Sequence, residues 1–167
     1  VLRKVEEEMK KELDILVLQD YNKGFLTTDL IQGVLHLAKK NDIPVAVDPK
    51  KTDFWTYRGS SIVKPNRREL AEANKVELSE NFDLGQLEDL MRATKAKLQC
   101  DTLFVTLSEM GMAALDVNNV FYHCPALSNN ITDVCGAGDS VFAVAIDSWI
   151  RHLSMEKVLH RCLQAGK

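Results

Sequence analysis

Short apolar segments alternate along this chain with longer stretches in which apolar residues recur at helical spacing. The short segments have the length of buried strands and cover residues 15–18, 45–47, 61–63 and 103–105. The spacing predicts helices over 2–13, 27–40, 67–73, 86–99, 137–151 and 155–165, and a hairpin from 112–116 and 120–123. Buried strands that alternate with amphipathic helices form parallel sheets covered on both faces. We therefore expect an α/β fold with a mostly parallel sheet.

The composition is that of one soluble globular domain, or most of one. The chain has 167 residues, of which 46% are hydrophobic and 27% charged, and its formal net charge is -3. This balance offers no basic surface, so we expect no nucleic-acid partner. No apolar run is long enough to cross a bilayer and no signal peptide is visible, so we expect no membrane partner.

The cysteines indicate a reducing compartment. They are Cys100, Cys124, Cys135 and Cys162, and no two of them form a CxxC pair. No histidine stands at metal-ligand spacing from them. We therefore expect free thiols in a cytoplasmic protein.

Polar residues gather directly after the predicted strands. In chain order they are Asp20, Lys23, Asp48, Lys50, Lys51, Lys64, Asn66, Thr106, Ser108 and Glu109. The carboxyl ends of parallel strands mark the ligand crevice of such a sheet, so these side chains should converge on one edge. The lysines would suit a phosphorylated ligand there, although solvated surface lysines would look the same in sequence.

Gly136, Ala137, Gly138 and Asp139 stand where the helix predicted over 137–151 begins. Small side chains leave the first backbone N–H groups of a helix uncovered, and such groups bind phosphate oxygens. An ionised Asp139 in the first turn could accept the proton of a substrate hydroxyl. A tight loop followed by a helix cap is the alternative interpretation of the same four residues.

Several segments together resemble the PfkB/ribokinase-like carbohydrate kinases. Asp133 to Asp139 is similar to the family's signature D-T-x-G-A-G-D, and Lys64 to Glu69 to its N-x-x-E element. Val105 to Met112 resembles the nucleotide-side strand and turn, and Leu159 to Gly166 the helix that follows the catalytic helix. The resemblance implies a ribokinase-like three-layer α/β/α fold, and an enzyme that transfers a phosphoryl group from ATP to a sugar.

One branch of the family fits best, the D-glycero-D-manno-heptose-7-phosphate kinases. Asp20 to Gly24, Asp48 to Phe54 and Tyr57 to Gly59 resemble that kinase domain. Val134 replaces the general family's threonine, and that branch commonly has valine there. The implied reaction phosphorylates the anomeric hydroxyl of the heptose 7-phosphate, a step toward ADP-heptose and lipopolysaccharide.

The resemblance also implies roles for the catalytic loop. Asp139 would be the catalytic base and would contact the sugar substrate, while Gly136, Ala137 and Gly138 would form the anion hole. Cys135 would contribute only backbone to this loop.

Further roles concern the nucleotide, the metal and the sugar. Asn66 and Glu69 would organise Mg²⁺ and the ATP phosphates through water, and their spacing equally fits a helix N-cap with a capping-box glutamate. Thr106, Ser108 and Gly111 would lie near the nucleotide. For the sugar we expect contacts from two further side chains, Asp20 and Lys23.

By this resemblance, residues 1–167 form the C-terminal major part of a kinase domain, a truncated fragment without the start of the sheet and the lid. The full-length protein would bind ATP and a sugar phosphate, could form a homodimer and could carry a fused nucleotidyltransferase domain. Two alternatives stay open. The chain could belong to another PfkB kinase, a fructokinase or a phosphofructokinase-like enzyme, or it could be a non-catalytic nucleotide-binding fragment.

Overall fold

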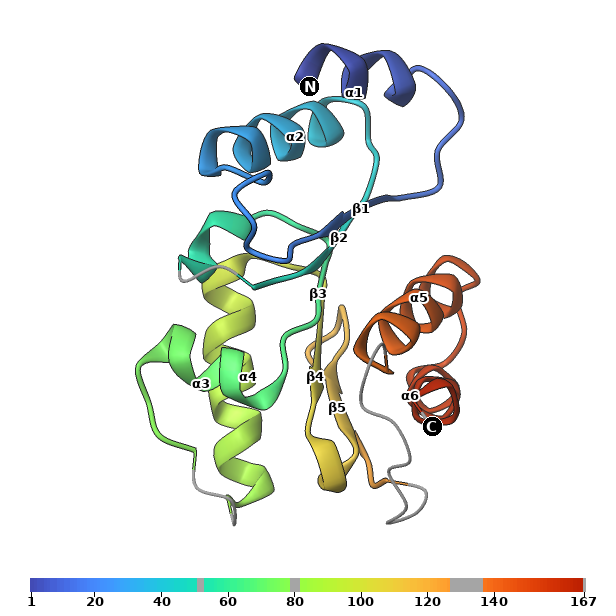
Figure 1. Cartoon of the computed structure of the whole chain (residues 1–167). Helices are drawn as coiled ribbons and strands as arrows, with labels where there is room; N and C mark the ends of the chain where they lie inside the picture. Colours follow the sequence, from blue (N-terminus) through green and yellow to red (C-terminus); the bar gives the residue numbers. More distant parts are fainter. Residues whose placement is uncertain (51–52, 79–81, 127–136, 167) are drawn as a thin grey trace.

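A mixed sheet organises the computed structural model, which describes residues 1–50, 53–78, 82–126 and 137–166 (Figure 1). The strands lie in the order β1-β2-β3-β4-β5-β6. Their bounds are β1 Leu16–Gln19, β2 Val45–Asp48, β3 Ile62–Val63, β4 Thr102–Thr106, β5 Met112–Leu115 and β6 Phe121–Cys124. The first four run parallel, and β5 and β6 add an antiparallel hairpin. The predicted α/β fold and its terminal hairpin are confirmed.

The predicted helices are also present. They are α1 Leu2–Met9, α2 Thr28–Lys40, α3 Arg67–Asn74, α4 Leu84–Leu98, α5 Ala137–Ile150 and α6 Met155–Ala165. The first helix ends at Met9, short of the predicted residue 13. Two short 3₁₀ helices, η1 Phe54–Tyr57 and η2 Ser108–Met110, were not predicted, because one turn is too short to show a period. Among the described helices, none has the length and apolar character needed to cross a bilayer.

Alternation along the central strands creates a separate core on each face of the sheet. On β4, Leu103 and Val105 belong to the core beneath α2, α3 and α4, whereas Phe104 faces the other way. Phe104 packs in a second core with Phe142 of α5 and Leu159 of α6. In Figure 1 the pair α5 and α6 accordingly covers one face and the pair α3 and α4 the other. The central strands β2 to β5 are mostly apolar because both of their faces are buried.

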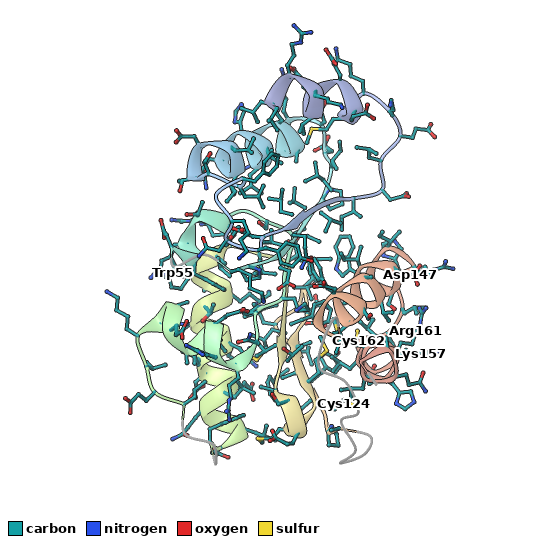
Figure 2. All side chains as sticks on the ribbon, viewed as in Figure 1. Trp55, Cys124, Asp147, Lys157, Arg161 and Cys162 are labelled. Carbon is teal, nitrogen blue, oxygen red and sulfur yellow. The ribbon has the colours of Figure 1, made fainter. Side chains whose placement is uncertain are left out.

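The pair α5 and α6 is fastened on both its buried and its exposed side. Asp147 on α5 accepts a hydrogen bond from Arg161 on α6 at 3.0 Å, and Arg161 also donates to the buried Ser148 at 2.9 Å. Inside, the thiol of Cys162 donates to the carbonyl of Val141 at 3.6 Å (Figure 2). These contacts hold α6 against α5.

The parallel strands end together at one edge of the sheet. The backbone N–H of Asp20 donates to the carbonyl of Asp48, which joins the segments after β1 and β2. Asn66 forms an isolated parallel bridge with Thr106, which joins the segments after β3 and β4. The predicted convergence of strand ends is therefore confirmed among the described residues.

Candidate active site

Asp139 lies in the first turn of α5 and reaches the carboxyl end of β1. Its Oδ1 accepts a hydrogen bond from Nε2 of Gln19 at 3.0 Å, and its Oδ2 accepts one from the hydroxyl of Tyr21 at 2.9 Å. The hydrogen bond from Tyr21 to the carboxylate raises the pKa of this exposed phenol. Asp139 is exposed at this edge of the sheet, in the first turn of the helix where the sequence predicted it.

The start of α5 is open beside Asp139. Ala137 and Gly138 form the first residues of the helix, while Gly136 lies outside the described residues. A Cβ atom built on Gly138 would meet no described atom within 4 Å. The described residues therefore leave space for an anion next to first-turn N–H groups that have no partner within the helix.

A buried ion pair stands behind the edge. Lys64 follows β3, and its Nζ lies 3.4 Å from Oδ1 of Asp48, the last residue of β2. The side chains are 3% and 2% exposed, and the ammonium also lies 5.6 Å from the ring centre of Phe142. Oδ1 of Asp48 has no hydrogen bond of good geometry, so its charge is balanced through space by lysines.

Lys50 extends this pair toward α3. Its Nζ lies 2.6 Å from Oε1 of Glu69 and 3.5 Å from Oδ1 of Asp48. Partial burial lowers the pKa of Lys50, but its hydrogen bond to Glu69 and the charge of Asp48 outweigh burial and leave the pKa above its ordinary value. Lys50 therefore stays charged between two carboxylates, whereas Lys51, the other predicted phosphate contact of this loop, lies outside the described residues.

Asn66 and Glu69 form the capping box of α3. Oδ1 of Asn66 accepts from the N–H of Glu69 at 2.8 Å, and Oε2 of Glu69 accepts from the N–H of Asn66 at 2.8 Å. One of the two predicted interpretations, the helix cap, is thereby confirmed. With Oε1 on Lys50, each carboxylate oxygen of Glu69 already accepts one hydrogen bond and keeps one lone pair.

That arrangement fits magnesium through water rather than by direct ligation. Mg²⁺ usually keeps several of its waters and takes its remaining oxygens from carboxylates and phosphates. The free lone pairs of Glu69 can accept from such waters while the capping box stays intact. In the part of the chain that the structure describes, no three His, Cys, Asp or Glu side chains form a direct metal cluster.

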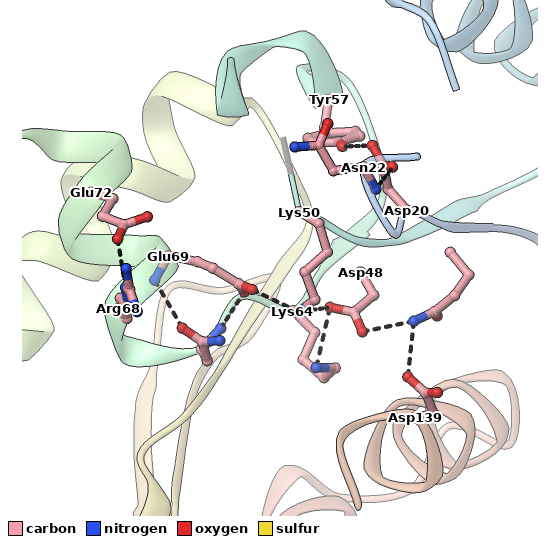
Figure 3. Close-up of polar contacts among 12 residues, drawn as sticks. Asp20, Asn22, Asp48, Lys50, Tyr57, Lys64, Arg68, Glu69, Glu72 and Asp139 are labelled. Atoms are coloured by element: carbon pink, nitrogen blue, oxygen red, sulfur yellow. Dashed lines mark hydrogen bonds and ion pairs between the residues drawn. The ribbon is translucent and has the colours of Figure 1, made fainter. Parts of the chain in front are cut away.

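The amide of Gln19 links the two ends of this site. Its Nε2 donates to Oδ2 of Asp48 at 2.9 Å and to Oδ1 of Asp139 at 3.0 Å. Together with the ion pairs, this gives a continuous chain of polar contacts from Glu69 through Lys50 and Asp48 to Asp139 (Figure 3). The site thus combines an open helix start, an exposed carboxylate, and a buried charged framework behind it.

Comparison with known proteins identifies the family of the chain. The profile of the pfkB family carbohydrate kinases matches residues 5–167. The chain belongs to this family.

Curated relatives within the family carry the name bifunctional protein HldE. The one from Aliarcobacter butzleri is 38% identical over 144 residues, which are 86% of this chain and 29% of that protein. The one from Rhodopseudomonas palustris is 40% identical over 131 residues, 78% of this chain and 26% of that protein. The chain therefore spans less than a third of the length of these relatives.

Solved structures share the fold at low sequence identity. Phosphofructokinase-2 from Escherichia coli in complex with potassium superposes with a TM-score of 0.84 at 19% identity, covering 99% of this chain and 54% of that one. Ribokinase from Arabidopsis thaliana complexed with ribose and ATP gives a TM-score of 0.78 at 20% identity, covering 99% and 50%. The ribokinase-like fold expected from the sequence is confirmed.

Asp20, one of the two expected sugar contacts, is enclosed by the protein in this structure. It is only 3% exposed, and its oxygens accept hydrogen bonds from the N–H of Asn22 at 2.7 Å and the hydroxyl of Tyr57 at 2.5 Å. Side chains alternate in direction along extended backbone, so Asp20 points away from the side that Gln19 and Tyr21 share. Its carboxylate thus shapes the loop after β1, and its contact with the sugar remains a prediction.

Lys23 stands apart from that buried aspartate. It is exposed on the same loop, and its contact with the sugar remains a prediction.

The three predicted nucleotide contacts differ in burial and in backbone conformation. Thr106 is half-buried at the end of β4, and Ser108 is exposed with a left-handed φ of 54°. Gly111 has φ 87°, and a Cβ there would come within 2.1 Å of the carbonyl oxygen of Cys124. Glycine is therefore required at 111 by the tight packing of the turn, and contact of these three residues with nucleotide remains a prediction.

The contacts of Gln19 and Tyr21 with Asp139 were not predicted from the sequence. No local pattern marks them, because their partner Asp139 is 120 and 118 positions away along the chain. Their positions in the sequence could have indicated them, because they flank Asp20 at the end of β1, where the ligand edge of the sheet was predicted.

Proposed function

We propose that this chain carries the phosphoryl-transfer machinery of an ATP-dependent sugar kinase, with Asp139 as the catalytic base. The observation that supports this most is the position of Asp139. Its carboxylate is exposed at the carboxyl ends of β1 and β2, in the first turn of a helix whose start is open beside Gly138. Ligands of open α/β sheets bind outside these strand ends.

The chemistry follows from that geometry. The sugar hydroxyl oxygen attacks the γ-phosphorus of ATP, the bond from that phosphorus to the ADP oxygen breaks, and the hydroxyl proton passes to Asp139. The N–H groups at Ala137 and Gly138 face the charge on the transferred group. Phosphoryl transfer has a loose transition state with little covalent chemistry, so a well-placed ordinary carboxylate is sufficient.

Asn66 and Glu69 would hold the magnesium of MgATP through water, beside the ammonium of Lys50. When bound, the metal would neutralise phosphate charge. The task of these protein groups is to orient its water shell while Lys50 contributes a fixed positive charge to the phosphates.

As substrate we propose D-glycero-D-manno-heptose 7-phosphate, phosphorylated at its anomeric hydroxyl in ADP-heptose and lipopolysaccharide precursor synthesis. The support is the 36–40% identity to proteins named HldE and the motifs around Asp20, Asp48 and Tyr57. Those relatives are called bifunctional and are several times longer than this chain. We therefore also propose that the parent protein carries a second, nucleotidyltransferase domain.

The open edge of β1 supports a larger kinase domain around this chain. Val17 of this edge strand is 46% exposed, Phe25 is 68% exposed, and a groove of about 350 Å³ lies beside them, lined mostly by apolar residues. An exposed apolar strand edge is suited to pairing with another strand. We propose that preceding strands of the kinase domain cover it, and that the enzyme works in the cytoplasm, where ATP is available and its thiols stay reduced.

The test is ADP release by the full-length protein with ATP, Mg²⁺ and a panel of sugar phosphates. Turnover with the heptose 7-phosphate, well above that with fructose 6-phosphate or fructose, is the expected result. Preference for fructose 6-phosphate would keep the kinase and overturn the substrate. Nucleotide binding without turnover on any sugar would contradict the proposed activity.

A further inference from the structure

We propose that Gln19 is a positioning residue for phosphoryl transfer, because its amide holds the Asp139 carboxylate in place and ties it to the buried Asp48. This inference rests on the proposed function, since it concerns how the base of that reaction is oriented.

The first argument is the fixed geometry of Gln19 itself. It is the last residue of β1 and pairs in register with Asp48, the last residue of β2. Its backbone is therefore set by the sheet rather than by a loop. From this position one nitrogen, Nε2, donates to Asp48 at 2.9 Å and to Asp139 at 3.0 Å. The amide NH₂ carries two hydrogens, so a single group satisfies both acceptors.

The second argument is the charge on either side of that amide. Asp48 and Asp139 both present a carboxylate to Gln19, and Asp48 is held from behind by the buried Lys64 (Figure 3). Without a donor between them, two like charges would face each other at the sheet edge and repel. Asp139 is exposed on α5, so its side chain has room to turn, whereas Asp48 is buried. Loss of the amide would therefore turn Asp139 away from the strand ends.

The third argument is that the two donors leave Asp139 competent as a base. Gln19 holds Oδ1 and Tyr21 holds Oδ2, and each oxygen keeps one lone pair for a substrate hydroxyl. Gln19 and Tyr21 are two positions apart, so their side chains leave the chain on the same side, as they would from extended backbone. Gln19 and Tyr21 thus orient the carboxylate and leave a lone pair on each oxygen free to accept the substrate proton. Misplacement of a catalytic group by about 1 Å can lower the rate roughly 100-fold.

The experiment compares full-length wild type with Gln19→Met, which keeps the side-chain length and removes both donors. We expect kcat to fall roughly 10- to 100-fold, with KM for ATP unchanged because the nucleotide site is not altered. Gln164→Met makes the same chemical change on the exposed face of α6 and should leave kcat unchanged. Tyr21→Phe provides a second variant at a 57% exposed side chain, so it tests the same orientation even if Gln19→Met folds poorly.

A double mutant separates positioning from a general structural defect. If Gln19 acts through Asp139, adding Gln19→Met to Asp139→Asn should lower kcat no further, whereas a structural defect would cost the same in both backgrounds. Wild-type kcat in Gln19→Met, or equal losses in both backgrounds, would overturn the inference and leave the kinase activity standing. Wild type that turns over no sugar would instead contradict the proposed function, and this inference with it.

Discussion

Nζ of Lys64 lies 3.4 Å from Oδ1 of Asp48, and both side chains are almost completely enclosed by the protein. An ammonium and a carboxylate buried this deeply are costly to desolvate, so neither would be tolerated without the other. The amide of Gln19 donates hydrogen bonds to both Asp48 and Asp139. The buried pair therefore helps to fix the position of the Asp139 carboxylate. We therefore expect the residues at the ends of β2 and β3 to contribute both to stability and to the proposed catalysis.

The first prediction concerns this pair. Lys64→Met should lower the free energy of unfolding by about 3 to 5 kcal/mol, because it leaves the Asp48 carboxylate buried without its closest cation. Urea denaturation measures the change. Glu72→Gln, which breaks the exposed ion pair of Arg68 with Glu72, is the matched control and should lower the free energy of unfolding far less. A loss in Lys64→Met as small as in this control would show that the buried pair does not stabilise the fold.

The second prediction separates the two roles of the α3 capping box. Glu69→Gln keeps a side chain that can still accept from the N–H of Asn66, so unfolding free energy should change by about 1 kcal/mol or less. Its neutral amide no longer balances Lys50 or orders the waters of magnesium, so the concentration of Mg²⁺ needed for half-maximal turnover should rise. Asn66→Ala should cost about 1 kcal/mol of stability through the lost cap. An unchanged magnesium requirement in Glu69→Gln would show that Asn66 and Glu69 cap the helix without binding the metal.

The third prediction uses the open space at Gly138. Alanine is favoured over glycine within a helix by roughly 0.5 to 1 kcal/mol, and the added Cβ would meet no described atom within 4 Å. Gly138→Ala should therefore keep or raise the melting temperature, yet raise KM for ATP because the methyl group occupies the place of a phosphate oxygen. Unchanged kinetics in this variant would argue against an anion site at the start of α5.

The fourth prediction is a fall in stability at alkaline pH. Burial raises the pKa of Cys100 and of Cys162 from 9.0 to about 12. Between these values the unfolded chain loses thiol protons that the folded chain keeps, so stability falls as pH rises from about 9 toward 12. At pH 10 each thiol should contribute a loss of about 1 kcal/mol. Urea midpoints at pH 8 and 10 check this, and a Cys100→Ala/Cys162→Ala variant with an undiminished pH dependence would contradict it.

The sequence was sufficient for most of the fold because its two periodicities are strong. Val45, Ala46 and Val47 are apolar without alternation, and such a run between amphipathic helices indicates a strand buried on both faces. The 3₁₀ turn at Phe54–Tyr57 could not be predicted in this way. It is held by aromatic edge contacts of Phe54 with Trp55 and Tyr57, which carry no periodic signal.

The site was predictable only where its residues are local in sequence. Gly138 and Asp139 belong to one continuous motif that is recognisable in the sequence. The spacing of Asn66 and Glu69 likewise indicated the capping box. The bridge through Gln19 depends on the register of β1 with β2 and on the packing of α5 over the sheet, neither of which a linear pattern contains. The burial of Asp20 could not be predicted, because the pattern locates a strand end without giving the side on which each side chain leaves it.

The central claim is that Asp139 takes the proton of the sugar hydroxyl. Asp139→Asn preserves the size of the side chain and removes the basic oxygen, so kcat should fall by about 10²- to 10⁴-fold. The affinity for ATP should stay close to that of wild type, because the helix start is unchanged. Asp147→Asn on the outer part of the same helix is the matched control and should retain full turnover.

The most direct test is kcat of full-length Asp139→Asn on heptose 7-phosphate, measured by ADP release alongside wild type and Asp147→Asn. A loss of two orders of magnitude or more, with ATP still bound, is the result that this account predicts. A kcat close to that of wild type would contradict it, because the carboxylate at the start of α5 would then not be the base.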